Sequence, residues 1–204
     1  MVECLRSAAV VPVATVEDPG LAPELARALV AAGLPCVEIT FRHPAAEEAL
    51  RRAAEVPGIL LGAGTVLSPA QAEAAAAAGA HFAVAPGTDR ETVEVCRDLG
   101  LPFFPGAATP TEIQAARGLG CSVVKLFPIS VLGGPAFIHA VSATYPEMGY
   151  LPTGGIGPDD VPTYLSIPTV VACGGSWIVR AELLRERRFA EIEALARAAV
   201  GSKS

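Results

Sequence analysis

Eight short apolar runs alternate with longer alanine-rich stretches in this chain, and this alternation limits the folds that it can adopt. The runs are rich in residues that favour strands, as VVPVATV at 10–16 and CVEITF at 36–41 illustrate. The stretches between them have helical composition, and Ser68-Pro69 and Thr109-Pro110 each combine a capping hydroxyl with a proline, as helix starts do. Strands that alternate with helices pair as a parallel sheet, so the sequence predicts an α/β fold.

Eight strand–helix units predict a closed (β/α)8 TIM barrel, and 204 residues fit the compact end of that fold. An open doubly wound sheet is the alternative, although no GxGxxG follows the first strand. We expect one domain over 1–200 and a polar C-terminal tail at 201–204. The predicted strands are 10–16, 36–41, 59–64, 81–85, 102–106, 122–127, 149–153 and 169–174. The predicted helices are 19–32, 44–55, 69–78, 89–99, 110–118, 134–144, 158–165 and 181–199.

The composition argues against several classes of function. The net charge is −6 and no cluster of Lys or Arg stands out, so a nucleic-acid partner is not expected. No apolar run approaches the ~18 residues of a membrane span, and the N-terminus lacks a signal-peptide pattern, so we expect a cytoplasmic protein without a membrane partner. The five cysteines form no CxxC pair and the three histidines lack metal spacing, so we expect reduced cysteines and no metal.

Lysine usage singles out one residue. The chain contains 13 Arg but only two Lys, and Lys125 lies inside the apolar run VVKLF, whereas Lys203 lies near the end of the chain. Alternation along the strand places Lys125 on the face toward the barrel interior, where burial favours the neutral amine. A neutral amine can attack a ketone to form a Schiff base. A structural ion pair with an inward carboxylate is an alternative of equal weight.

The second predicted strand carries polar residues on one face. Glu38, Thr40 and Arg42 alternate with apolar residues, so they are expected to line the barrel, with Arg42 nearest its mouth. An inward-facing Glu is rare unless it forms an ion pair or takes part in catalysis. Glu38 is therefore expected either to pair with Lys125 or to transfer protons for it. Arg42 offers a planar fork suited to a carboxylate, and a salt bridge at the rim is its alternative role.

Glycine-rich turns follow the last two strands. Thr153-Gly154-Gly155 follows the seventh strand and Gly174-Gly175-Ser176 follows the eighth, and these two loops commonly bind phosphate in such barrels. Tight turns without a ligand are the alternative. Thr65 follows the third strand and could donate a hydrogen bond to a carboxylate. Pro86 follows the fourth strand, where turn geometry is its favoured role.

Together these motifs resemble the 2-keto-3-deoxy-6-phosphogluconate (KDPG) aldolase family, which also includes 4-hydroxy-2-oxoglutarate (KHG) aldolases. The resemblance extends from the first strand to the eighth, and the last three strings are specific as a set. The matching strings are VVPV at 10–13, VEITFR at 37–42, GAGTV at 62–66, APGT at 85–88, PG at 105–106, VKLFP at 124–128, PTGGI at 152–156 and GGSW at 174–177.

The resemblance implies a homotrimer of (β/α)8 barrels that needs no metal, and we expect no cofactor. It implies an aldehyde-lyase, a class I aldolase of the Entner–Doudoroff pathway. Its substrate would be a phosphorylated keto acid, cleaved to pyruvate and glyceraldehyde 3-phosphate. It assigns Schiff-base formation to Lys125 and acid–base catalysis to Glu38. It assigns binding of the pyruvate carboxylate to Arg42 and Thr65. The phosphate site corresponds to Gly154, Gly155 and Ser176, and the pocket is expected to include Phe127, Pro86 and Thr153.

One departure from the family pattern leaves the specificity for the aldehyde half of the substrate undetermined. Many relatives have Pro-Ala-Glu after the lysine motif, whereas this chain has Pro128-Ile129-Ser130. The sequence alone distinguishes neither the gluconate from the galactonate substrate nor either of these from unphosphorylated 4-hydroxy-2-oxoglutarate. A sugar-phosphate isomerase or epimerase on the same barrel, with Glu38 as base and Lys125 as a fixed charge, is the rival enzyme. A non-catalytic phosphosugar sensor is the third hypothesis.

Overall fold

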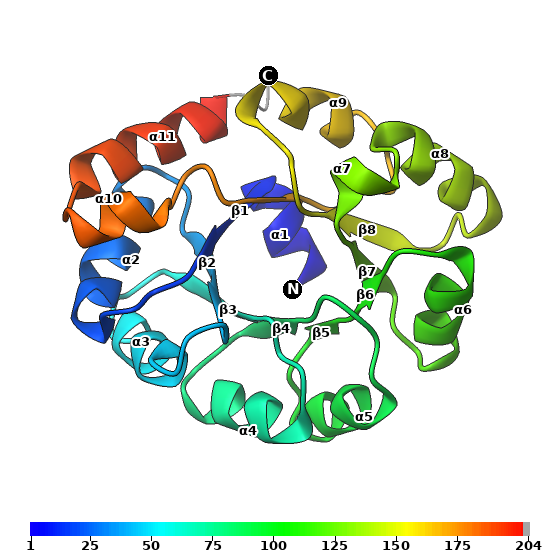
Figure 1. Ribbon diagram of the computed structural model, residues 1–204, viewed down its shortest axis with the longest axis horizontal. Helices are drawn as coiled ribbons and strands as arrows, with labels where there is room; N and C mark the ends of the chain where they lie inside the picture. Colours follow the sequence, from blue (N-terminus) through cyan, green and yellow to red (C-terminus); the bar gives the residue numbers. More distant parts are fainter. Residues whose placement is uncertain (202–204) are drawn as a thin grey trace.

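The computed structural model describes residues 1–201, and its strands form a ring that helices surround (Figure 1). The strands are β1 (Val10–Ala14), β2 (Cys36–Thr40), β3 (Leu60–Gly64), β4 (Phe82–Val84), β5 (Phe103–Phe104), β6 (Gly106–Ala107), β7 (Val123–Leu126), β8 (Gly149–Pro152) and β9 (Cys173–Gly175). The α-helices are α1 (Val2–Ala8), α2 (Ala22–Ala31), α3 (Ala46–Ala53), α4 (Pro69–Ala77), α5 (Arg90–Asp98), α6 (Pro110–Gly118), α7 (Ile129–Leu132), α8 (Pro135–Thr144), α9 (Val161–Leu165), α10 (Ala181–Arg185) and α11 (Phe189–Gly201). Short 3-10 helices η1 (Pro19–Leu21) and η2 (Pro158–Asp160) precede α2 and α9.

Parallel pairing closes the strands into a barrel. Six strands pair in the order β5-β4-β3-β2-β1-β9, and three pair in the order β6-β7-β8. At one junction β8 meets β9, where Tyr150 pairs with Val170 and Thr153 with Gly174. At the other, β5 and β6 are separated only by Pro105. The predicted (β/α)8 barrel is confirmed, and the open sheet is excluded because both edges of the sheet are joined.

The fifth predicted strand, 102–106, is divided by Pro105 into β5 and β6. Proline has no backbone N–H and interrupts a strand ladder. Before it, β5 pairs with β4; after it, β6 pairs with β7. The carbonyl oxygen of Pro105 accepts a hydrogen bond of 2.8 Å from the backbone N–H of Lys125. The proline therefore lies where the chain passes from one group of strands to the other, next to the predicted nucleophile.

Three helical features differ from the prediction. Helix α1 was not predicted, yet its Leu5 side chain is fully buried and the helix lies across the centre of the ring in Figure 1. The one-turn helix α7 was also not predicted. The single helix expected over 181–199 is divided into α10 and α11, and Arg187 between them has a positive φ of 54°. A residue with positive φ cannot continue a right-handed helix, so the chain changes direction there.

Two predicted helix starts are confirmed by their caps. The Ser68 hydroxyl accepts a hydrogen bond of 3.3 Å from the backbone N–H of Gln71, at the start of α4. At α6, Thr109 and Glu112 form a reciprocal capping box. Helix α11 continues to Gly201, and the rest of the predicted tail at 201–204 lies outside the described residues. Within residues 1–201, no helix is long and apolar enough to cross a membrane.

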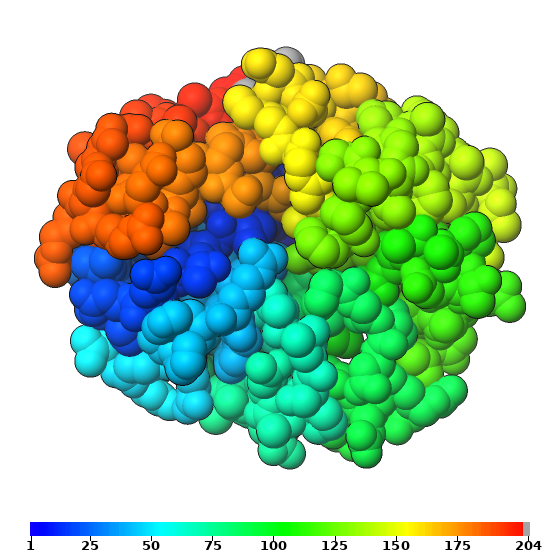
Figure 2. Space-filling view, viewed as in Figure 1, coloured from blue at the N-terminus to red at the C-terminus, as the bar shows by residue number. Residues whose placement is uncertain are grey.

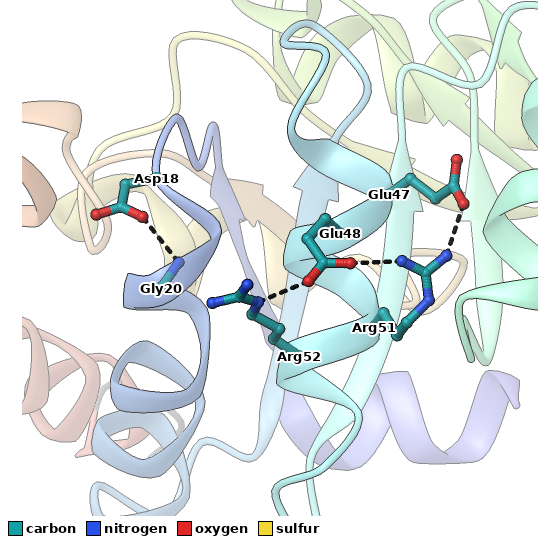
Figure 3. Close-up of polar contacts among 6 residues, drawn as sticks. All are labelled: Asp18, Gly20, Glu47, Glu48, Arg51 and Arg52. Carbon is teal, nitrogen blue, oxygen red and sulfur yellow. Dashed lines mark hydrogen bonds and ion pairs between the residues drawn. The ribbon is translucent and has the colours of Figure 1, made fainter.

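The outer face of α3 carries a ladder of ion pairs (Figure 3). Arg51 donates to Glu47 at 2.7 Å and to Glu48 at 2.5 Å, and Arg52 donates to Glu48 at 2.7 Å. These bonds from Arg52 and Arg51 hold the pKa of the Glu48 carboxyl below its usual range. Because all four side chains are 41–49% exposed, screening by water leaves such pairs only a small effect on stability.

Candidate active site

The barrel encloses a charged pair contributed by opposite sides of the ring. Lys125 on β7 is 3% exposed and Glu38 on β2 is 0% exposed. The Lys125 Nζ donates a hydrogen bond of 3.2 Å to Glu38 Oε1. Strand alternation correctly predicted that both side chains point inward. An ion pair enclosed in this way is costly to bury and needs good geometry, so it is an unusual choice for a barrel interior unless it has a function.

The second oxygen of the Glu38 carboxylate is free to act. Glu38 Oε2 is buried and has no hydrogen-bond partner among residues 1–201. Nearly all buried polar atoms in proteins have such a partner, so this atom is exceptional. While Oε1 holds the lysine, Oε2 is thus available to accept a hydrogen bond or a proton from a reacting group.

Phe127 connects the lysine to the first glycine turn. The Lys125 Nζ lies 5.6 Å from the centroid of the Phe127 ring, within the range of a cation–π contact. A Cβ on Gly154 would lie 3.1 Å from the same ring. The Phe127–Pro128 peptide bond is cis. The predicted pocket residue Phe127 therefore lies between the predicted nucleophile and the turn that follows β8.

The turn after β8 is the predicted phosphate-binding turn, and its conformation requires glycine. Gly154 has a φ of 96° and Gly155 a φ of 77°, both in the region that other residues rarely adopt. A Cβ on Gly155 would lie 2.2 Å from the Ser130 hydroxyl oxygen, so Ser130 packs directly against this turn. The backbone N–H of Ser130 also donates to the Gly154 carbonyl at 3.1 Å. Ser176 follows β9 and is exposed.

Thr153 and Pro86 occupy the edge of the barrel interior. Thr153 is 6% exposed, and its hydroxyl donates to the Leu151 carbonyl at 3.3 Å. A Cβ on Gly174 would lie 2.4 Å from that hydroxyl oxygen, so the glycine leaves room for the threonine. Pro86 follows β4, and a Cβ on Gly106 would lie 2.1 Å from its carbonyl carbon. The backbone of Pro86 thus packs closely against Gly106 in β6, and its role in turn geometry stays a prediction.

The two predicted carboxylate ligands lie beyond the ends of neighbouring strands. Arg42 is in the turn after β2, is exposed, and makes no ion pair with any residue in the range 1–201. Thr65 follows β3 and has a φ of 57°. A β-branched residue with positive φ is a genuine outlier, and such strain clusters at functional sites. Within residues 1–201, no hydrogen bond or ion pair joins either side chain to the Lys125–Glu38 pair.

Thr40 was expected to face the barrel interior, but its hydroxyl partner, Thr15, was missed in the sequence. Thr40 is fully buried on the same face of β2 as Glu38, and its hydroxyl lies 2.9 Å from that of Thr15, just after β1. The two hydroxyls share one hydrogen bond, so the pair retains a second donor. Strand alternation marks Thr40 as inward-facing, but Thr15 lies beyond the strand end, and its role depends on the register between β1 and β2.

The space-filling view in Figure 2 shows atoms of segments coloured from blue through cyan, green and yellow to orange meeting around the centre of the ring. The chemical centre is therefore enclosed by several strands rather than borne on one loop. An amine and a carboxylate buried within hydrogen-bond distance form a nucleophile with an adjacent proton carrier. Such a pair is suited to covalent chemistry on a carbonyl compound.

Comparison with known proteins identifies the family. The family model described as KDPG and KHG aldolase matches residues 1–195. The chain is 44% identical over 194 residues to the 2-dehydro-3-deoxy-phosphogluconate aldolase of Treponema pallidum (strain Nichols), covering 95% of this chain and 92% of that protein.

Solved structures agree in fold. A KDPG aldolase from Legionella pneumophila, with pyruvate captured at low pH as a covalent carbinolamine intermediate, has a TM-score of 0.93 and 35% identity, and the match covers 98% of each chain. The aldolase of Zymomonas mobilis ZM4 with 3-phosphoglycerate has a TM-score of 0.91 and 34% identity, covering 99% of this chain and 96% of that one. This chain belongs to the KDPG and KHG aldolase family.

Proposed function

We propose that this chain is a class I aldolase that cleaves 2-dehydro-3-deoxy-6-phosphogluconate to pyruvate and glyceraldehyde 3-phosphate. The observation that carries the proposal is the buried Lys125 Nζ, held 3.2 Å from Glu38 inside a barrel of this family. The carbinolamine in the Legionella relative supports covalent capture of pyruvate by such an enzyme. An isomerase that used Lys125 only as a fixed charge would form no such adduct.

The amine of Lys125 starts the reaction. It attacks the C2 ketone to give a carbinolamine, which loses water to become a protonated imine. The imine draws the electrons of the C3–C4 bond as that bond breaks, while the C4 hydroxyl loses its proton and becomes the aldehyde. The enamine that remains takes a proton at C3, and water then releases pyruvate and restores the free amine.

Glu38 moves the protons in this scheme. Its Oε1 contacts the nitrogen of Lys125, and its Oε2 is free to exchange protons with the substrate. The carboxylate can therefore take a proton at cleavage and return it to the enamine without moving away from the lysine. General acid–base catalysis by one group contributes about 10²–10⁴-fold to a rate. Glu38→Gln should lower kcat by roughly this factor while leaving Lys125 in place.

Arg42 and Thr65 are proposed to bind the carboxylate of the pyruvate unit. Arg42 is exposed and unpaired within the described chain, so its guanidinium is available to an anionic ligand. The strained backbone of Thr65 supports a role for its side chain. Both residues follow strands that neighbour one another, β2 and β3, and they extend beyond the strand ends toward the mouth.

The distal phosphate is proposed to bind to Gly154, Gly155 and Ser176. Glycines with positive φ present backbone N–H groups without side chains in the way, as in anion-binding turns. Ser130, which packs against Gly155, is neutral, so no carboxylate at this position repels a phosphate. Ser176→Ala should raise KM for the phosphorylated substrate and leave the binding of pyruvate unchanged.

Cleavage of 4-hydroxy-2-oxoglutarate to pyruvate and glyoxylate is a second candidate activity. The matching family includes KHG aldolases, and the proposed covalent step uses Lys125 and Glu38 but not the phosphate turn. The ratio of kcat/KM for the two substrates measures the preference directly. The galactonate epimer is tested in the same assay.

A homotrimer in the cytoplasm is also proposed. Leu67 is 58% exposed and Val131 is 80% exposed, and both are apolar side chains that association would cover. Light scattering after gel filtration should give three times the mass of the chain. A monomeric mass would refute the trimer without bearing on the chemistry, and cell fractionation tests the location.

The central test is borohydride reduction in the presence of pyruvate, followed by mass spectrometry of the intact protein and its peptides. The only lysines are Lys125 and Lys203, so an adduct is easily assigned. We expect one reduced pyruvyl group on Lys125, full labelling of Lys203→Arg as the matched control, and none in Lys125→Ala. Turnover by Lys125→Ala at a near-native rate would refute the covalent scheme.

A further inference from the structure

The third strand contains two inward-facing glycines, and the backbone conformation requires glycine at neither position. Gly62 and Gly64 lie in β3 and alternate with Ala63. Neither has a positive φ, so alanine would fit the backbone at both positions. Glycine weakens a strand interior and often marks a close approach by another group. The question is which groups approach these two positions.

Each glycine makes room for a different side chain. A Cβ on Gly62 would lie 2.3 Å from the ring of Phe82, which is its register partner on β4. A Cβ on Gly64 would lie 2.2 Å from Oε1, 2.6 Å from Cγ and 2.7 Å from Cδ of Glu38. Non-bonded carbon atoms pack best at about 3.5–4.0 Å, so the entire end of the Glu38 side chain occupies the space of the missing methyl group.

The strand register shows what this arrangement does to the carboxylate. Glu38 is in register with Gly62, and Thr40 is in register with Gly64. The Glu38 carboxyl nevertheless lies against Gly64, so the side chain leans along the barrel axis toward the C-terminal ends of the strands. That position places Oε1 beside the Lys125 Nζ, at 3.2 Å. A side chain on residue 64 would occupy the same space, so the Glu38 carboxyl group could not lie there.

We propose that Gly64 is a positioning residue for the aldol reaction, because its lack of a Cβ seats the Glu38 carboxylate beside Lys125. The inference rests on the proposed aldolase function and adds a residue whose role is to place another residue. Gly64 acts through Glu38: with a methyl group at residue 64, the carboxyl group must move, and both its contact with Nζ and its reach to the substrate change.

Gly64→Ala is the first variant, and Gly62→Ala is its matched control. Both add one methyl group to the same strand and the same face, but the control displaces Phe82 instead of Glu38. We expect Gly64→Ala to lower kcat by about 10²–10⁴-fold, as loss of a general acid–base does, and to change the pH dependence of kcat. Gly62→Ala should lower Tm yet keep the wild-type pH dependence.

Shortening the carboxylate side chain gives a sharper test. Glu38→Asp removes one methylene, so it should slow the wild-type enzyme. In the Gly64→Ala enzyme it removes the contacts of Oε1 at 2.2 Å and Cδ at 2.7 Å but keeps a carbon near the Cγ position, 2.6 Å from the added Cβ, so it relieves the collision in part and should cost less activity than in the wild type. Such a difference between the two backgrounds is a coupling between the two positions that independent effects do not produce. If Glu38→Asp slows both backgrounds by the same factor, or if Gly64→Ala turns over like the wild type, the proposal is wrong.

A stability measurement covers the case in which Gly64→Ala fails to fold. In the Glu38→Ala background the side chain that collides is absent, so adding Gly64→Ala should leave Tm unchanged. In the Glu38→Gln background the uncharged side chain has the same size, so Gly64→Ala should lower Tm sharply. Equal losses of Tm in the two backgrounds would locate the effect in the backbone and overturn the proposal.

Exchange of the pyruvate methyl protons into D2O separates this proposal from the aldolase function itself. The exchange requires the imine and a proton carrier but no phosphorylated substrate, and NMR follows it directly. A wild-type enzyme that neither exchanges protons nor traps pyruvate would refute the aldolase. A wild-type enzyme that exchanges, alongside a Gly64→Ala variant that exchanges equally fast, would refute only the role of Gly64.

Discussion

Thr65, a proposed substrate-binding residue, allows the cost of its strained backbone to be measured. Its φ of 57° lies in the left-handed region, and both neighbours are anchored. The Gly64 carbonyl accepts from the Phe41 N–H at 2.7 Å, and the Val66 N–H donates to the Val84 carbonyl at 3.1 Å. The flanking hydrogen bonds hold Thr65 in a conformation that it would not adopt alone. Comparison of Thr65→Ala with Thr65→Gly isolates the backbone cost, since both variants lose the hydroxyl and the methyl group.

The magnitude follows from two opposing terms. A left-handed conformation costs an L-residue roughly 1–2 kcal/mol, and glycine avoids this cost. Glycine loses about 0.5–1 kcal/mol through the greater freedom of its unfolded chain. Thr65→Gly should therefore be about 0–1.5 kcal/mol more stable than Thr65→Ala. For a chain of this size that difference raises Tm by about 0–6 °C. At an ordinary strand or helix position the alanine variant is more stable than the glycine variant. A Thr65→Gly variant that is more stable than Thr65→Ala would therefore itself indicate a strained backbone.

Denaturant unfolding, followed by the fluorescence of the single tryptophan, Trp177, measures this difference. The same two variants also report function, because Thr65→Ala and Thr65→Gly should both raise KM for the carboxylate substrate. Thr65→Ser retains the hydroxyl and should not raise it. A Thr65→Ala variant more stable than Thr65→Gly by roughly 0.5 kcal/mol or more, the ordinary preference for alanine, would refute the strain argument.

Three further changes test the fold. Leu5→Ala should cost about 2–5 kcal/mol in denaturant unfolding, because Leu5 is fully buried and the cavity would remain. Thr109→Ala should cost about 1 kcal/mol in the same assay, because it removes the cap on the Glu112 N–H. Hydrogen bonds from Thr92 hold the pKa of the Asp89 carboxyl below its usual range, so Asp89 stabilises the fold at neutral pH and this contribution is lost as pH falls below about 4. Tm of Asp89→Asn should accordingly fall less steeply with acid than that of the wild type.

The strand alternation predicted the inward direction of Lys125 and Glu38 because a period of two residues depends only on local sequence. Pairing of Glu38 with Lys125 was one hypothesis from the sequence, but alternation alone could not show that the two side chains come within 3.2 Å, because β2 and β7 lie on opposite sides of the ring. The division of the fifth strand could have been expected from Pro105, which cannot donate to a ladder. The one-turn helix α7 was not predictable, because its four residues are too few to show a helical period.

Gly64 shows a different limit of the sequence. The GAG string at 62–64 has a period of two, and that period indicates that both glycines face the same way. Nothing local indicates that one glycine accommodates Phe82 and the other Glu38, because those side chains come from the two neighbouring strands. Glycines in a strand thus indicate that a neighbouring group approaches closely. Only the register between the strands identifies which side chain that is.

Helix α1 precedes β1 and lies across the centre of the ring in Figure 1, and its Cys4 lines a cavity with Cys36 and Leu60 at the starts of β2 and β3. The helix therefore lies at the N-terminal ends of the strands, whereas Arg42, Thr65 and Ser176 follow the C-terminal ends. We expect substrates to reach Lys125 from the C-terminal ends. In the proposed scheme pyruvate is still bonded to Lys125 when the C3–C4 bond has broken, so the aldehyde should depart first. In the reverse condensation, pyruvate should bind before the aldehyde.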